Sequence, residues 1–96
     1  MPNRIKLNDE ALHDGLRGLP EWTYVEGKLR RELRFPDFVA AFGFMTQVAL
    51  HAERLNHHPE WSNVYGTVRI DLVTHDCGGV SALDLELARR IDALIA

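Results

Sequence analysis

Alternating apolar and polar positions predict a β-hairpin beginning near residue 22. Trp22 to Val25 is the first predicted strand, Glu26-Gly27 the turn, and Lys28 to Phe35 the second strand. The second strand has an apolar face and a charged face, which are Leu29, Leu33 and Phe35 against Lys28, Arg30, Glu32 and Arg34. Arg31 interrupts the apolar face, and this would fit a strand at the edge of the sheet.

A second hairpin is predicted further along the chain. Trp61 to Tyr65 forms a short strand, Gly66 lies in the turn, and Thr67 to Thr74 is the clearest strand. In that strand three apolar residues alternate with three polar ones, namely Val68, Ile70 and Leu72 with Thr67, Arg69 and Asp71. The segment from His75 to Gly79 then forms a loop.

Three helices complete the pattern. Asn8 is a plausible N-cap for a short first helix, and Pro36-Asp37 opens a long helix that runs to about Leu55. Ser81 and Asp84 have the spacing of a Ser-x-x-Asp capping box, which begins the final helix. The order α-β-β-α-β-β-α predicts an α+β fold, with a four-stranded antiparallel sheet and helices packed on one face.

The long helix has more apolar surface than one sheet can cover. Its predicted core stripe follows helical spacing and consists of Phe38, Phe42, Met45, Ala49 and Ala52. Further apolar residues lie off this stripe, namely Val39, Phe44, Val48 and Leu50. A helix that is apolar nearly all round must be covered on more than one side, and in so short a chain a second subunit can supply the cover. A homodimer or homotetramer is therefore expected.

Composition favours a small soluble protein. The 96 residues are expected to form a single domain, 1–96, because they leave no room for a second core. The net charge of −3 gives no reason to expect nucleic acid or membrane as a direct partner. Cys77 is the only cysteine, so no intramolecular disulfide can form and a reducing compartment is favoured. Because the N-terminus lacks a leader pattern and no apolar run is long enough to span a bilayer, a cytoplasmic protein is expected.

Three of the five histidines flank the second predicted hairpin. His57 and His58 follow the long helix, and His75 follows the last strand. If the two strands pair through the turn near Gly66, their outer ends lie side by side. The three imidazoles could then face one pocket.

Four interpretations of this group are open. Histidines often lie in polar loops by chance. A metal site is less favoured than acid/base chemistry, because the side chains of His57 and His58 tend to diverge and no His-x-x-x-His or Cys-x-x-Cys spacing is present. A third interpretation is a nucleophile, Cys77 or Ser81, activated by His75. The alternation of side-chain directions gives no sign that the Cys77 thiol faces His75. General acid/base catalysis fits best, because imidazole gives and accepts protons near neutral pH.

The residues around these histidines resemble a known family. The run from Glu53 to Tyr65, ERLNHHPEWSNVY, is similar to the signature of pterin-4a-carbinolamine dehydratases. Further matches follow at the family's spacing or lie upstream, and they are Thr74-His75-Asp76, Gly78-Gly79, Ser81, Asp84, Phe42 to Thr46 and Trp22. The likeness covers roughly Trp22 to Ile95. The whole ordered set of residues is a specific signal of the family, whereas a His-His-Pro sequence alone would be a weak one.

The resemblance implies a hydro-lyase that needs no cofactor and no metal. Its reaction would be the dehydration of 4a-hydroxytetrahydropterin to quinonoid dihydropterin, which recycles the pterin of aromatic amino acid hydroxylases. The resemblance assigns proton transfer to His57, His58 and His75, and we expect His57 and His75 to act most directly. It assigns pterin binding to Asn56, His57, His58, Val73, Thr74, His75 and Asp76.

Four further residues have supporting roles by resemblance, and they are Glu53, Pro59, Trp61 and Asp84. Asp84 has two open roles, since it can bond the Ser81 backbone within the capping box or orient His75. Glu53 is either a solvated helix carboxylate or a group at the pocket rim. Trp61 is more often a core or wall residue than a stacking partner. Pro59 would fix the loop that aims His58.

The resemblance also leaves a second function open. Some members of the family act as dimerisation cofactors for a transcription factor, so a non-catalytic adaptor is the alternative to an enzyme. The family pattern further suggests a tetramer built from dimers.

Overall fold

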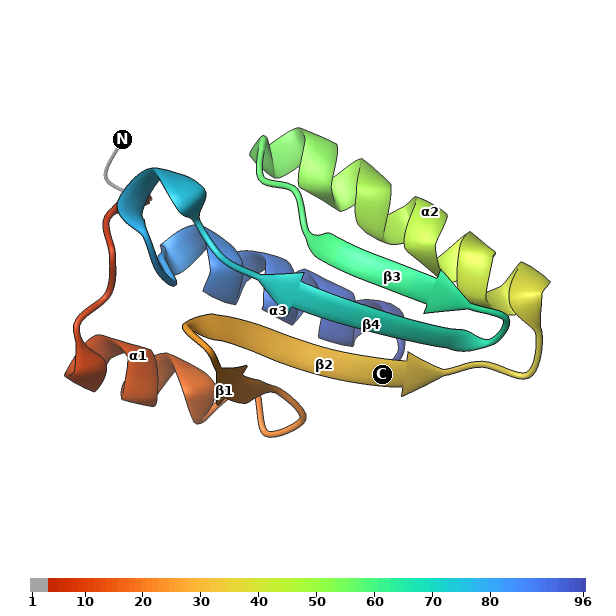
Figure 1. Cartoon of the computed structure of the whole chain (residues 1–96), viewed down its shortest axis with the longest axis horizontal. Coiled ribbons are helices and arrows are strands. Elements are labelled where there is room, and N and C mark those ends of the chain that lie inside the picture. Colours follow the sequence, from red (N-terminus) through yellow and green to blue (C-terminus); the bar gives the residue numbers. More distant parts are fainter. Residues whose placement is uncertain (1–3) are drawn as a thin grey trace.

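The protein is described by a computed structural model that covers residues 4–96. Its helices are α1 (Asp9–Leu16), α2 (Phe38–Leu55) and α3 (Ala82–Leu94), and a short 3-10 turn, η2, spans His75–Cys77. Its strands are β1 (Thr23–Val25), β2 (Lys28–Arg34), β3 (Glu60–Val64) and β4 (Thr67–Leu72). The predicted order of elements and the α+β class are confirmed (Figure 1).

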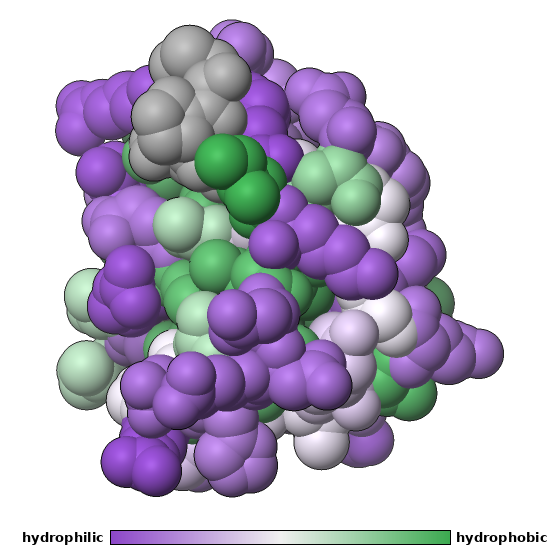
Figure 2. Space-filling model, turned by 90° about the vertical axis from the view of Figure 1, so that its left-hand side faces the viewer, coloured by the Kyte–Doolittle hydropathy of each residue, from purple (hydrophilic) through white to green (hydrophobic). Residues whose placement is uncertain are grey.

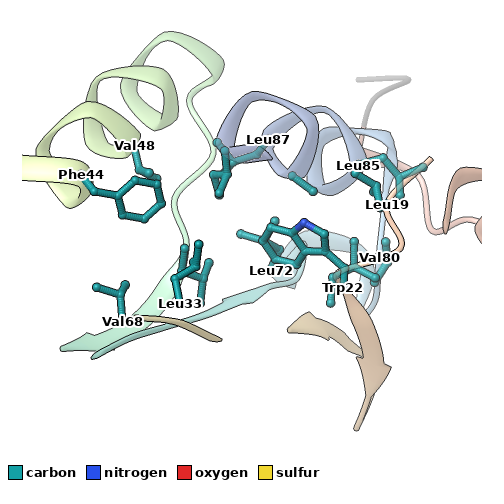
Figure 3. Close-up of a cluster of buried hydrophobic side chains, with 14 of the residues drawn as sticks. Leu19, Trp22, Leu33, Phe44, Val48, Val68, Leu72, Val80, Leu85 and Leu87 are labelled. Atoms are coloured by element: carbon teal, nitrogen blue, oxygen red, sulfur yellow. The ribbon is translucent and has the colours of Figure 1, made fainter. Parts of the chain in front are cut away.

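The four strands form one antiparallel sheet in the order β1-β2-β4-β3, so β2 and β4 are central. The register places Leu29 opposite Leu72 and Leu33 opposite Val68, which makes one face of the central strands apolar. Helices α2 and α3 pack on this face. Figure 3 shows Phe44 and Val48 of α2 and Leu87 of α3 above side chains of the sheet, and these residues belong to one buried cluster.

The buried face of α2 differs from the predicted stripe. Its buried residues are Ala41, Phe44, Val48 and Ala52, whereas Phe38 and Phe42 of the predicted stripe are 49% and 54% exposed. Most of the buried face is thus displaced by one residue, which corresponds to a rotation of about 100°. The prediction failed because a helix that is apolar nearly all round offers two comparable stripes. The structure buries the stripe of Ala41, Phe44 and Val48, and Ala52 is common to both stripes.

The prediction that Arg31 lies on an edge strand is also wrong. Arg31 is on β2, which is paired on both sides, and its side chain lies on the face toward the helices. Its guanidinium donates to Oδ1 of Asp92 on α3 at 2.6 Å, and Nε1 of Trp22 donates to the same oxygen at 2.8 Å. The charge on this face is therefore tolerated because it is paired at the end of α3.

The turn between β3 and β4 brings their outer ends together. Gly66 in this turn packs so closely that an added Cβ would lie 2.3 Å from the carbonyl oxygen of Phe35, and the Phe35 amide donates to the Gly66 carbonyl at 2.7 Å. This contact fixes the hairpin against the end of β2. Within residues 4–96 no helix is both long and apolar enough to cross a membrane.

Candidate active site

The candidate site lies where β3 begins and β4 ends. Asn56 ends α2 in the left-handed conformation, with φ 50° and ψ 46°, and the chain then turns through His57 and His58 into β3. Beyond β4, Thr74 forms an isolated bridge with Gly79, and η2 lies between them. Because Glu60 at the start of β3 is opposite Asp71 near the end of β4, both segments reach the same end of the sheet.

These segments line an open pocket of about 200 Å³. Its lining is Arg4, Asn56, His57, His58, Val73, Thr74, His75 and Asp76. The three histidines therefore line one pocket, together with the other four residues that the resemblance assigns to pterin binding. Figure 2 shows that the end of the molecule carrying the N-terminal residues is mostly hydrophilic, with apolar side chains visible between the polar ones.

His57 is the buried member of the group and is 5% exposed. Its Nε2 lies 2.5 Å from Oδ1 of Asp84, which is fully buried. The other carboxylate oxygen of Asp84 accepts from the Ser81 amide and from the Thr74 hydroxyl, each at 2.8 Å. With Oδ1 of Asp84 as the acceptor, Nε2 of His57 is the donor in this contact. Nδ1 of the ring has no hydrogen-bond partner among residues 4–96 and is left to meet a ligand.

His58 and His75 are exposed and are each held by a different carboxylate. Nε2 of His58 lies 2.5 Å from Oε1 of Glu53, which is in the last turn of α2. Nε2 of His75 lies 2.6 Å from Oε2 of Glu60, the first residue of β3. Each of the three imidazoles is thus bound through Nε2 to one carboxylate, which fixes the orientation of the ring and leaves Nδ1 for other contacts.

Glu60 alone among these three carboxylates has a cation partner within residues 4–96. Nζ of Lys28 donates to Oε1 of Glu60 at 2.6 Å. This hydrogen bond, opposed by partial burial and assisted by the contact with His75, holds the pKa of Glu60 below its ordinary value. Glu60 therefore stays ionised in neutral solution and accepts from both partners.

The structure places the predicted supporting residues in different surroundings, and only some of them contact a pocket histidine. Both the capping box and an orienting contact exist at Asp84, but the imidazole that Asp84 contacts is His57 and not His75. The reason is that η2 carries His75 toward β3, where Glu60 is its partner. Glu53 contacts His58, but its side chain is 75% exposed and does not line the pocket. Trp61 does not line this pocket and instead borders an apolar hollow beside α2.

The thiol of Cys77 points to backbone groups. Its Sγ lies 3.5 Å from the carbonyl oxygens of Thr74 and Gly79, and no contact with His75 is recorded within residues 4–96. This gives no support to a thiol nucleophile activated by His75. The described part of the chain also holds no cluster of three or more His, Cys, Asp or Glu side chains arranged to bind a metal ion.

Sequence reasoning missed Arg4, Lys28 and Glu60. Arg4 lines the pocket and donates to the Asn56 carbonyl at 2.7 Å, a contact across 52 positions that no local pattern could reveal. Lys28 and Glu60 lie on the open face of the sheet, and their contact depends on the register of three strands. The alternation places each on a face but does not give that register.

Comparisons with known proteins place the chain among relatives of one kind. A family model described as pterin 4 alpha carbinolamine dehydratase matches residues 5–94. Relatives named putative pterin-4-alpha-carbinolamine dehydratase include one from Solibacter usitatus, 55% identical over 95% of this chain and 96% of the relative, and one from Prochlorococcus marinus, 57% identical over 92% of each. A crystal structure titled transcriptional coactivator/pterin dehydratase, from Brucella melitensis, superimposes with a TM-score of 0.90 at 43% identity and covers 95% of this chain and 99% of that one.

Proposed function

The chain belongs to the pterin-4a-carbinolamine dehydratase family, and on this premise we propose that it dehydrates 4a-hydroxytetrahydropterin to quinonoid dihydropterin. The observation that supports this most directly is the shared pocket of His57, His58 and His75, each bound to its own carboxylate. We further propose that the reaction recycles the pterin of aromatic amino acid hydroxylases in the cytoplasm.

The reaction breaks the bond between C4a and its hydroxyl oxygen and removes the proton from N5. An imidazolium gives a proton to the departing hydroxyl, which leaves as water. A neutral imidazole takes the N5 proton, and the electron pair of that N–H bond forms the double bond between N5 and C4a. One proton is added and one is removed, and no electron is transferred, so the step needs no redox cofactor.

His57 and His75 are our candidates for the two proton transfers, with His58 in support. Asp84 fixes the ring of His57 and can stabilise its imidazolium, as a carboxylate bound to an imidazole does in other acid/base sites. His75 lies on the opposite segment of the pocket, so a flat ring bound between the two segments would meet one histidine from each. Asn56, Val73, Thr74 and Asp76 complete the binding surface.

The test is the rate of 4a-hydroxytetrahydropterin dehydration, followed by ultraviolet absorbance beside a no-enzyme control. Wild type should accelerate the reaction, and His57→Ala should lose most of the acceleration, by about 10²-fold or more if His57 is a direct acid or base. His13→Ala is the matched control, because His13 lies on α1 and does not line the pocket. A folded wild-type protein that only matches the spontaneous rate would exclude the enzyme.

An adaptor role is the second candidate, and the exposed face of α2 favours it. Val39 and Leu50 are 79% and 61% exposed, and the rings of Phe38 and Phe42 contact each other at a tilt of 57°, with centroids 5.6 Å apart. Such a face suits a second copy of the chain, and we propose a homodimer or homotetramer. A variant lacking all three pocket histidines separates the roles, because a pure adaptor should retain its binding while an enzyme loses its activity.

A further inference from the structure

We propose that Glu60, held in place by Lys28, is a positioning residue for His75. The proposal rests on the proposed function and adds to it two side chains that do not line the pocket. It concerns the orientation of one imidazole and assigns neither residue a contact with the substrate.

His75 needs an external support more than the other direct histidine does. Its side chain is 75% exposed and stands on a 3-10 turn of three residues. An exposed side chain on such a turn samples several rotamers, and each of them moves the ring nitrogens relative to a bound substrate. Within residues 4–96, the ion-pair contact of Nε2 with Oε2 of Glu60 at 2.6 Å is the one side-chain contact recorded for this ring. That contact selects one orientation.

Glu60 can serve His75 because its two oxygens have different partners. Oε1 accepts from Nζ of Lys28 and Oε2 lies against Nε2 of His75 in an ion-pair contact, both at 2.6 Å. The carboxylate is thus fixed from the side of β2 before it meets the imidazole. Without Lys28, the carboxylate could rotate toward solvent, because Glu60 is at the end of an edge strand.

The register of the sheet explains why this pairing forms. Glu60 lies directly opposite Asp71 on the open face, and two carboxylates placed there repel each other. Arg30 binds Asp71 with two hydrogen bonds, at 2.7 and 3.0 Å, and so offsets one of the charges. Lys28 reaches across β4 and offsets the other. Arg69 adds a third cation on this face, 3.9 Å from Asp71.

The test compares Glu60→Ala and Lys28→Met with Glu32→Ala. Glu32 is the matched control, because it lies on the same open face and its only recorded partner within residues 4–96 is Arg34, at 3.5 Å. Glu60→Ala should lower kcat on the order of tenfold with a smaller change in KM, since His75 remains but loses its orientation. Lys28→Met should lower kcat severalfold, and Glu32→Ala should match wild type. Wild-type kcat in Glu60→Ala, or an equal loss in Glu32→Ala, overturns the proposal.

A second readout does not depend on activity. The nitrogen chemical shifts of the imidazole rings report which ring nitrogen carries the proton in the neutral form. In wild type, neutral His75 should be protonated at Nε2, and in Glu60→Ala it should become a mixture of both tautomers, with His13 unchanged. An unaltered His75 tautomer overturns the proposal. If wild type fails to accelerate dehydration, the proposed function fails, and the tautomer measurement still decides whether Glu60 orients His75.

Discussion

Replacing Asp84 by asparagine should separate its structural role from its effect on His57. Oδ2 of Asp84 accepts from the Ser81 amide and the Thr74 hydroxyl, and Oδ1 accepts from Nε2 of His57. An asparagine side chain has one accepting oxygen and one donating NH₂ group. Because the Ser81 amide can only donate, the asparagine oxygen should take the side of Ser81. Its NH₂ group then faces His57 and requires the neutral ring to carry its proton on Nδ1.

The expected loss of unfolding free energy in each Asp84 variant depends on which hydrogen bonds that variant keeps. The asparagine side chain would keep the capping contact, so we expect Asp84→Asn to cost about 1 kcal/mol of unfolding free energy. Asp84→Ala leaves the buried donors of Ser81 and His57 without an acceptor, while the Thr74 hydroxyl keeps Ser81 Oγ at 2.6 Å, and the change should cost roughly 3–5 kcal/mol. In both variants His57 loses its carboxylate, and the asparagine variant also reverses its tautomer. The dehydration rate should therefore fall by about 10²- to 10⁴-fold even where the fold is nearly intact.

Three measurements check this prediction on the same samples. Urea unfolding gives the free energies, ultraviolet absorbance gives the dehydration rate, and imidazole nitrogen shifts give the tautomer of His57. The reasoning is refuted if Asp84→Asn retains the wild-type rate. It is also refuted if the asparagine variant is as unstable as Asp84→Ala, because the capping contact would then not depend on one accepting oxygen.

Four further predictions follow from single contacts. Arg4→Met should raise KM severalfold with little change in kcat, and steady-state kinetics with an unchanged KM would exclude Arg4 from binding. Lys28→Met should raise the pKa of Glu60 toward its ordinary value of 4.5, which a carboxyl NMR titration can show. A carboxylate with a lowered pKa loses its stabilising contribution as the pH falls through that pKa. In acid unfolding the loss should therefore begin at a higher pH in the variant than in wild type. Gly66→Ala should destabilise by about 1–3 kcal/mol in urea, whereas Gly18→Ala, whose nearest neighbouring atom would be 4.0 Å away, should stay within about 0.5 kcal/mol. Phe42→Asp should lower the molar mass in sedimentation if α2 forms the subunit interface, and an unchanged mass would place the interface elsewhere.

Local patterns predicted the elements well because each depends on neighbouring residues. The Ser81 capping box, the Asn8 cap and the turn at Glu26-Gly27 all appear where the sequence places them. The same patterns could not rotate α2 correctly, because its exposed side also carries large apolar residues, namely Phe38, Val39, Phe42 and Leu50. They also could not pair Arg31 with Asp92, 61 positions away, since that contact exists only once α3 lies on the sheet.

The grouping of the three histidines was predictable from the sequence, but their carboxylate partners were not. His57, His58 and His75 could be grouped because a hairpin must bring its two outer ends together. The partner of each imidazole depends on side-chain directions that spacing does not give. Glu53 and His58 are close in the sequence at the same end of α2, so their contact is local. That Asp84 contacts His57 and not His75 depends on the path of the chain through η2, which the sequence does not reveal.

The burial of the carboxylate pairs determines which variants test the chemistry most cleanly. His57 and Asp84 are buried and share their hydrogen bonds with the start of α3, so a change at either residue alters folding and proton transfer together. His75 and Glu60 lie at the surface, where a truncation leaves no buried group unpaired. A loss of activity in Glu60→Ala, with unfolding free energy unchanged, therefore reports on the orientation of His75. Since dehydration needs one proton donor and one acceptor, losing either pair should remove most of the acceleration, and the outer pair can show this without the ambiguity of a destabilised core.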